Sequence, residues 1–242
     1  PKKRAILDII SKSINTDQHL EQIIGSDYPQ FSSFVPEIAR LDAQYQEQKK
    51  TIQVMDYDDL LVNTKQLLTD HPHVLKEVTD HFQYIMVDEY QDTNHLQSDV
   101  VRLLGGARRN IMVVGDDCQS IYSFRGANVD HILSFPAQFP GTKMVSLEEN
   151  YRSTQPILDL TNAVIAAASH AYDKDLFTAN KEGSKPVFVE TGDEATQSRF
   201  VCQKILELRE SGVPLDKIAV LVRSGWHSND LEVALKSSGL PF

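Results

Sequence analysis

Residues 84–94 of this chain read YIMVDEYQDTN, a short apolar run that stops abruptly at two carboxylates, Asp88 and Glu89. Two further segments have the same form, NIMVVGDD at residues 110–117 and MVSLEEN at residues 144–150. Brief apolar runs bounded by polar residues are typical of strands buried in a parallel sheet. The sequence therefore predicts three strands, each ending at a cluster of polar side chains.

Helical segments lie between these predicted strands. One is expected over residues 96–104, closed by the pair Gly105 and Gly106, and another over residues 129–139. Alternating strands and helices predict an α/β fold, with a parallel sheet covered by helices on both faces. Ligands of such sheets bind beyond the carboxyl ends of the strands, where the polar clusters would lie.

The residues before this sheet have a helical pattern. Phe34, Ile38, Leu41 and Tyr45 recur at helical spacing and predict an apolar stripe. Asp56 precedes an acidic and apolar run, and we interpret it as the N-cap of a further helix. The chain is therefore expected to open with a helical segment.

A second α/β unit is predicted after Asn150. Thr154 is suited to cap a helix that has Pro156 in its first turn and continues to Ala168. Two apolar runs further along predict strands, and two longer stretches predict helices. The strands are expected at residues 187–189 and 218–222, and the helices at residues 199–209 and 229–236.

The composition is that of a globular protein without a disulfide framework. The 242 residues are 41% hydrophobic, and no apolar run is long enough to cross a bilayer. Only Cys118 and Cys202 are present, so a reducing cytoplasm is the expected location. The net charge of −10 does not favour nucleic acid by itself, because phosphate binding needs local Lys and Arg. A motor protein can still bind DNA in one narrow cleft, so a nucleic-acid-binding function stays open.

The pair Asp88 and Glu89 has the chemistry of a magnesium and water site. One carboxylate can hold Mg²⁺, and a second can orient or deprotonate an attacking water. The alternative is that such a pair caps the helix that follows, as acidic residues often do. The pair alone does not decide between these interpretations.

Two longer strings favour the first interpretation. Residues 114–127 read VGDDCQSIYSFRGA, and residues 147–154 read LEENYRST. With residues 87–94, they resemble motifs II, III and IV of the superfamily 1 helicases related to UvrD, Rep and PcrA, in order and in spacing. The resemblance covers essentially the whole chain, including MDYDDL at residues 55–60 and IAVLVR at residues 218–223.

This resemblance implies a P-loop NTPase fold of the RecA-like kind, with parallel sheets and flanking helices, incomplete and preceded by a helical segment. It implies a remnant of a 1B insertion at residues 1–55, part of domain 1A at residues 56–149 and part of domain 2A at residues 150–242. The implied activity is ATP-dependent, 3′-to-5′ DNA unwinding. The implied cofactors are ATP and Mg²⁺, and the implied partners are single-stranded DNA and single/double-strand junctions, with no membrane.

The resemblance also implies roles for five residues at the nucleotide. Asp88 would bind Mg²⁺, and Glu89 would be the catalytic base. Gln119 would sense the γ-phosphate and link it to the DNA site. Tyr151 would stack on adenine, and Arg152 would reach the γ-phosphate from the second domain. The simpler alternative for Arg152 is an ion pair with a neighbouring glutamate, Glu148 or Glu149, at the surface.

The resemblance also implies that Phe124, Arg125 and Tyr122 bind DNA. The ring of Phe124 would stack on a base, and the guanidinium of Arg125 would lie near the backbone. The simpler alternative makes Phe124 a core side chain. The family usually has Trp in place of Phe124 and an acidic residue in place of Cys118. We expect stacking over a smaller area, and a small buried thiol at Cys118.

A phosphate-binding loop is not found in the sequence. Such a loop needs Gly-x-x-x-x-Gly-Lys-Ser/Thr, and no Gly-Lys pair occurs in the 242 residues. We therefore expect an internal piece of a helicase that is inactive alone. Two alternatives stay open: the helicase subunit of a helicase–nuclease, and a truncated module that binds DNA or a partner without catalysis.

Overall fold

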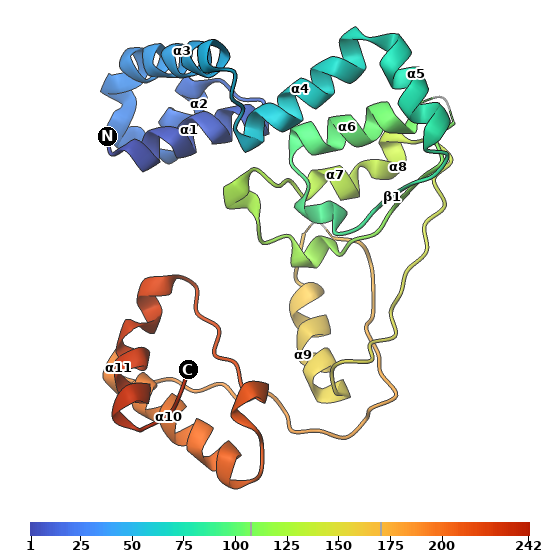
Figure 1. Ribbon diagram of the computed structural model, residues 1–242. Coiled ribbons are helices and arrows are strands. Elements are labelled where there is room, and N and C mark those ends of the chain that lie inside the picture. The colour runs from blue at the N-terminus through green and yellow to red at the C-terminus, as the bar shows by residue number, and fades with distance from the viewer. Residues whose placement is uncertain (107, 170) are drawn as a thin grey trace. The chain divides into compact units, whose positions relative to one another are not determined.

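The computed structural model describes residues 1–106, 108–169 and 171–242, in which helices predominate (Figure 1). These residues form two compact units, Pro1–Gly183 and Ser184–Phe242. Within the described ranges, no helix is both long enough and apolar enough to cross a membrane. The two strands lie in the first unit.

The first unit opens with three helices around a small isoleucine core. They are α1 (Lys3–Thr16), α2 (Leu20–Asp27) and α3 (Val35–Ile52). The isoleucines, each at most 1% exposed, are Ile9, Ile23, Ile24 and Ile38. The predicted apolar stripe is correct for Ile38 and wrong for Leu41 of α3 and for Phe34, which directly precedes α3; both of these are 43% exposed. Helical spacing alone does not identify which face of a helix is covered.

Two further helices, α4 (Tyr57–Asp70) and α5 (Pro72–His81), lead to the sheet. Asp56 caps α4 as predicted: its carboxylate accepts a hydrogen bond from the backbone N–H of Asp59 at 2.9 Å. Lys49 pairs with the carboxylates of Asp56 and Asp59, at 2.7 Å and 2.8 Å. The acidic start of α4 is therefore a cap with its own counter-ion.

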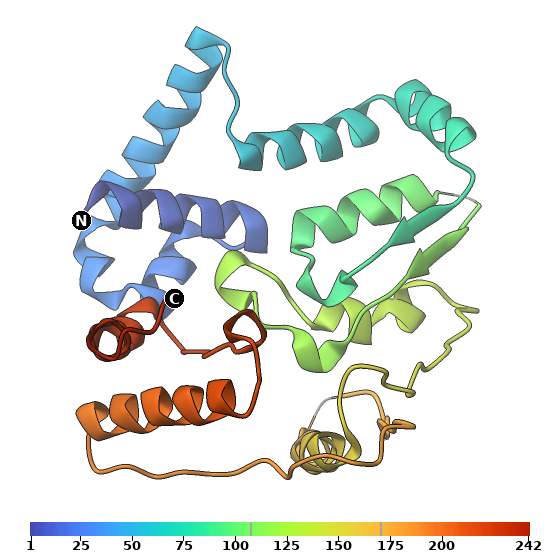
Figure 2. The same cartoon turned by 60° about the horizontal axis from the view of Figure 1, so that its bottom comes forward.

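A two-stranded parallel sheet follows. The strand β1 (Ile85–Val87) pairs with β2 (Ile111–Val113), and α6 (His95–Gly105) connects them (Figure 2). This crossover agrees with the predicted α/β class. The single helix expected after β2 is divided into α7 (Asp130–Leu133) and α8 (Phe135–Gln138). Pro136 explains the division, because proline has no N–H to continue the helical hydrogen bonds.

Among the described residues, helices cover the sheet on one face only, which corrects the prediction of helices on both faces. Side chains of α6, α7 and α8 form a core with Tyr90 against the inward residues of both strands. Successive side chains of a strand point to opposite faces. Met86 and Met112 are paired in register on the other face and are 71% and 52% exposed.

The third predicted strand, residues 144–147, is not formed. Val145 and Leu147 are 73% and 83% exposed, and one isolated bridge joins Glu149 to Phe177. No neighbouring strand lies beside residues 144–147 within the described part of the chain. Apolar character does not make a strand without a partner to complete the hydrogen-bond ladder. The prediction was therefore wrong about this segment.

After the third string, α9 (Gln155–Ile165) begins after Thr154 with Pro156 in its first turn, as predicted, and ends before Ala168. Thr154 occupies the N-cap position, but its side chain forms no capping hydrogen bond. The second unit contains α10 (Glu194–Glu210) and α11 (Asn229–Ser237). Its core consists of Cys202, Ile205, Leu231, Leu235 and Leu240. The strands predicted at residues 187–189 and 218–222 are not formed, and Phe188 and Leu221 are 90% and 94% exposed. These segments also have no strand beside them among the described residues.

Candidate functional site

Asp88 and Glu89 lie directly after β1, and both are exposed. Glu89 has a left-handed backbone, with φ 51° and ψ 40°, a conformation that costs a non-glycine residue about 1 kcal/mol or more. Oδ1 of Asp88 accepts a hydrogen bond from the N–H of Glu89 at 3.0 Å. Asn94, and neither carboxylate, caps α6 by accepting from the N–H of Gln97. The helix-cap alternative therefore does not describe this acidic pair.

Gln91 joins the two strand ends through a side chain that is 1% exposed. Its Nε2 donates to Oε2 of Glu89 at 2.8 Å, and its Oε1 accepts from the N–H of Asp116 at 3.1 Å. Space for this amide depends on Gly115, because a Cβ there would lie 2.4 Å from Oε1 of Gln91. The sequence analysis missed Gln91, since a glutamine in a polar string has the pattern of a surface residue. Its place between the two acidic strings was the available signal.

Asp92 adds a third carboxylate beside the pair. Its Oδ1 is buried and has no hydrogen-bond partner among the described residues. Burial, and then the charge of Glu89, raise the pKa of Asp92 above its ordinary value. The loop after β1 therefore holds one carboxylate with a raised pKa beside the exposed Asp88 and Glu89.

A partly buried lysine, Lys174, holds the loop after β2. Nζ of Lys174 pairs with Oδ1 of Asp116 and, at 2.8 Å, with Oδ1 of Asp117. The N–H of Tyr172 donates to Oδ2 of Asp117 at 2.9 Å, and Nε2 of Gln119 donates to Oδ2 of Asp116 at 2.7 Å. The segment after α9 is thereby fastened to the loop that carries Gln119. Sequence patterns missed Lys174 because its partners lie far away along the chain.

The charges of this cluster offset one another. Burial alone would raise the pKa of Asp116, but hydrogen bonds from Lys174 and Gln119 outweigh it and hold that pKa below its ordinary value. Ligand atoms of Asp116, Asp117 and Cys118 lie within 4.8 Å of one another. The ammonium group of Lys174 already supplies the positive charge there, so we assign no metal to this cluster. Cys118 is exposed, which corrects the expectation of a buried thiol.

Aromatic side chains follow this cluster. The rings of Tyr122 and Phe124 lie 5.9 Å apart, and Phe124 is 65% exposed. Phe124 is therefore not the core side chain of the alternative interpretation. The loop turns at Gly126, whose φ of 85° suits glycine. The side chain of Arg125 lies outside the described part of the structure.

Tyr151 and Arg152 precede α9 and are both exposed. The hydroxyl of Tyr151 donates to Oε2 of Glu149 at 2.7 Å. Oδ1 of Asn150 accepts hydrogen bonds from the N–H groups of Arg152 and Ser153, at 2.9 Å and 2.7 Å. Among the described residues, no ion pair joins Arg152 to a glutamate. The surface ion pair of the alternative interpretation is therefore not formed.

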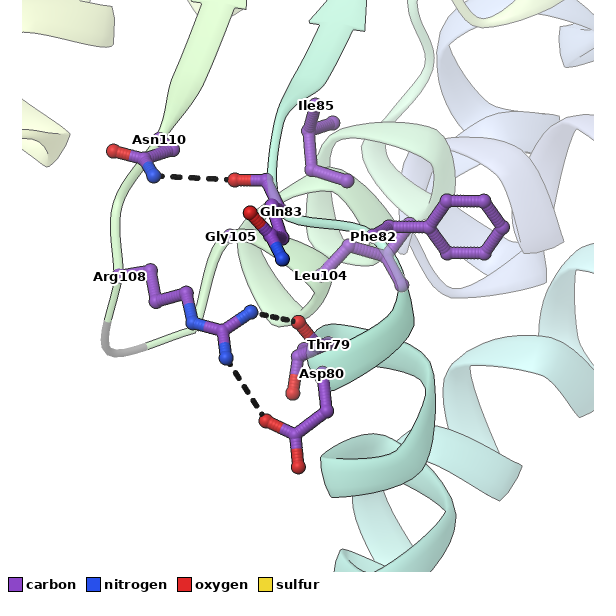
Figure 3. A pocket seen from close by; sticks show the side chains of 9 residues that line it. All are labelled: Thr79, Asp80, Phe82, Gln83, Ile85, Leu104, Gly105, Arg108 and Asn110. Atoms are coloured by element: carbon purple, nitrogen blue, oxygen red, sulfur yellow. Dashed lines mark hydrogen bonds and ion pairs between the residues drawn. The ribbon is translucent and has the colours of Figure 1, made fainter.

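The hollow drawn in Figure 3 lies at the opposite, amino ends of the strands, with a volume of about 130 Å³. Arg108 donates to the carbonyl of Thr79 at 2.6 Å and to Asp80 at 3.0 Å. Asn110 donates to the carbonyl of Gln83 at 3.1 Å. These bonds tie the residues before both strands to the C-terminus of α5. We therefore assign this hollow a structural role.

Comparison with known proteins identifies the protein family to which the chain belongs. The profile of the UvrD/REP helicase N-terminal domain matches residues 2–140, and that of the UvrD-like helicase C-terminal domain matches residues 145–242. The chain therefore belongs to the UvrD/REP helicase family, whose domains have the P-loop NTPase fold. The family that the motifs predicted is confirmed.

Similar relatives include proteins named ATP-dependent DNA helicase PcrA. That of Leuconostoc citreum is 37% identical over 242 residues, and those of Staphylococcus epidermidis and Staphylococcus aureus are 39% identical over 205 residues. These matches cover 99% and 85% of this chain but 32% and 28% of the relatives. The chain thus spans about a third of the length of the curated relatives it matches.

Proposed function

We propose that this chain works within an ATP-dependent DNA helicase, which couples ATP hydrolysis to 3′-to-5′ translocation on single-stranded DNA and to duplex unwinding. One observation carries the proposal: two motif loops meet at the carboxyl edge of the sheet. The Gln91 amide joins Glu89 to Asp116 across this edge, and Gln119 is bonded to Asp116. Parallel sheets bind ligands at this edge.

At the nucleotide, the exposed carboxylate of Asp88 would hold Mg²⁺, for which carboxylate oxygens are suitable ligands. When bound, this ion screens the negative charge of the phosphates. Glu89 accepts the proton of the attacking water, and Gln119 reports the γ-phosphate. The Tyr151 ring stacks on adenine, and the Arg152 guanidinium stabilises charge on the transferred phosphate. The exposure of both side chains supports these roles.

On the DNA, Phe124 stacks on a base and Tyr122 lies beside it, with Arg125 near the backbone. An exposed aromatic ring is a platform that every base can use, which suits a motor that moves along any sequence. We propose domains 1A and 2A over residues 56–149 and 150–242, after a 1B remnant at residues 1–55. Nucleotide would then draw the second domain onto the first, and hydrolysis would release it.

The proposal is tested with protein expressed from the complete reading frame. ATP hydrolysis should rise on addition of single-stranded DNA, and a strand should be displaced from a duplex with a 3′ tail but not from one with a 5′ tail. Turnover that ignores DNA would overturn the proposal, and degradation of the displaced strand would favour the helicase–nuclease alternative. The 242-residue chain alone should release no phosphate, because it has no Gly-Lys pair to hold the β- and γ-phosphates.

A further inference from the structure

We infer that Gln91 is the positioning residue that holds the Glu89 carboxylate in register with the loop of Asp116. The inference rests on the proposed function, in which Glu89 is the base. It names a residue whose side chain touches neither nucleotide nor metal in that scheme. Gln91 would act through Glu89 on one side and through the backbone of Asp116 on the other.

The orientation of the Gln91 amide follows from its partners. Nε2 is a donor and lies 2.8 Å from a carboxylate oxygen of Glu89, whereas Oε1 is an acceptor and lies 3.1 Å from the N–H of Asp116. The reversed amide would place an oxygen against the carboxylate and an NH₂ group against the N–H. The Gln91 side chain is 1% exposed, so water reaches its amide too little to offset such repulsions, and the observed orientation is the stable one.

Glu89 needs a positioning residue because its surroundings do not fix it. The side chain is exposed, and the backbone beneath it is left-handed. A base must stay within hydrogen-bond reach of the water that it deprotonates. The buried amide of Gln91 holds the Glu89 carboxylate through a direct hydrogen bond. The same Nε2 lies 3.5 Å from Oδ2 of Asp92, a longer and weaker contact.

The same amide can pass a displacement from one loop to the other. Asp116 donates its N–H to Gln91, and its carboxylate accepts from Gln119. A shift of Gln119 toward a γ-phosphate would therefore move the group to which Gln91 is bonded. Gln91 has no room to absorb that shift, because Gly115 lies against it without space for a Cβ. The geometry thus couples detection of the phosphate to the position of the base.

Two substitutions separate this role from simple packing. Gln91→Leu keeps a similar volume but removes both donor and acceptor. Gln91→Glu keeps an acceptor for the Asp116 N–H and replaces the donor with a charge that repels Glu89. In protein from the complete reading frame, both variants should lower kcat about 10- to 100-fold, the size expected for a misplaced catalytic group. The KM for ATP should change less than about 3-fold, because Gln91 does not hold the nucleotide.

The decisive control is Glu89→Gln. If Gln91 acts through Glu89, adding Gln91→Leu to Glu89→Gln should lower kcat no further. A full additional loss in the double variant, or a normal kcat in Gln91→Glu, would overturn the inference. If Glu89→Gln itself keeps its kcat, the proposed function of Glu89 is at fault instead.

One measurement does not depend on the variants being active. In the 242-residue chain, the side-chain amide protons of Gln91 should exchange slowly with solvent, and Glu89→Ala should shift their NMR resonance. An unchanged resonance would show that the bond to Glu89 is not formed in solution, and the inference would fail.

Discussion

The loops after β1 and β2 differ from residues 148–152 in how their functional side chains are held. In the first region, Gln91 and Lys174 bridge residues far apart in the chain through partly buried hydrogen bonds and ion pairs. In the second, the side chains of Tyr151 and Arg152 are exposed; the Tyr151 hydroxyl donates to Glu149, and the Arg152 N–H donates to Asn150. The side chains of the first region are held in place by the fold, as the proposed chemistry requires. In the proposed scheme, the side chains of the second region act only when nucleotide is brought against them.

Arg152→Ala should have the largest effect, a loss of kcat, and it tests whether the second region takes part in catalysis. We expect kcat in protein from the complete reading frame to fall about 10³- to 10⁵-fold, the usual value of an arginine that stabilises phosphoryl transfer. Thermal stability should not change, because Arg152 forms no ion pair with a glutamate within the described structure. Arg199→Ala is the matched control on another exposed arginine, and it should leave kcat unchanged. A normal kcat in Arg152→Ala would remove the second region from catalysis.

Glu89→Gln should have the next largest effect. It keeps the shape of the side chain and removes the base, so kcat should fall about 10²- to 10⁴-fold while nucleotide binding persists. Steady-state phosphate release and equilibrium binding of an ATP analogue measure the two quantities. Glu190→Gln, an exposed glutamate of the second unit, is the control. If hydrolysis survives in Glu89→Gln, Asp92 becomes the leading candidate for the base.

Lys174→Met tests whether the first region is held together by its partly buried ion pairs. We expect the first unit to lose about 3 kcal/mol of unfolding free energy, near the lower end for losing one partner of a buried pair. The lower end applies because the Asp116 side chain is 31% exposed. Urea unfolding followed by amide resonances of the first unit measures this loss. Lys204→Met, which removes an exposed pair with Glu207, should change little.

The same variant has a defined dependence on pH. The folded-state pKa of Asp116 lies below its ordinary value of 3.8, so the stability gained from its ionised form is fully present above pH 3.8. That gain is lost as the pH falls through the lowered pKa. The difference in stability between the parent chain and Lys174→Met should therefore shrink below pH 3.8. A difference that stays constant down to full protonation would show that packing, and not charge, is the contribution of Lys174.

Phe124→Ala should have the smallest effect of the series. Binding of single-stranded DNA should weaken by about 1–3 kcal/mol, the range for one stacked base. Phe124→Trp should hold or tighten binding, since the larger ring offers more area. Phe188→Ala removes a ring that is even more exposed, at 90%, and should leave DNA affinity unchanged. Equal losses in both alanine variants would indicate a non-specific effect of exposed rings.

Local patterns predicted the elements whose partners are near in sequence. The strands expected at residues 84–87 and 110–114 are found at Ile85–Val87 and Ile111–Val113, and Asp56 caps α4 as predicted. Residues 144–147 have the same apolar pattern and form no strand, because pairing depends on a neighbour that a local pattern does not reveal. Sequence patterns missed Lys174 for the same reason, and they missed Gln91 because a glutamine in a polar string has the pattern of a surface residue. The domain division and the roles of the site residues stay predictions.

The tight contact at Gly115 has a consequence for how this family varies. A Cβ at this position would lie 2.4 Å from Oε1 of Gln91 and 2.8 Å from Cδ1 of Ile132. Substitutions at the three positions are therefore not independent. A relative with alanine at the position of Gly115 should also have a shorter side chain at the position of Gln91, of Ile132, or of both. Laboratory evolution that begins with Gly115→Ala should recover activity through second changes at these two positions first. The three positions would then change together in evolution.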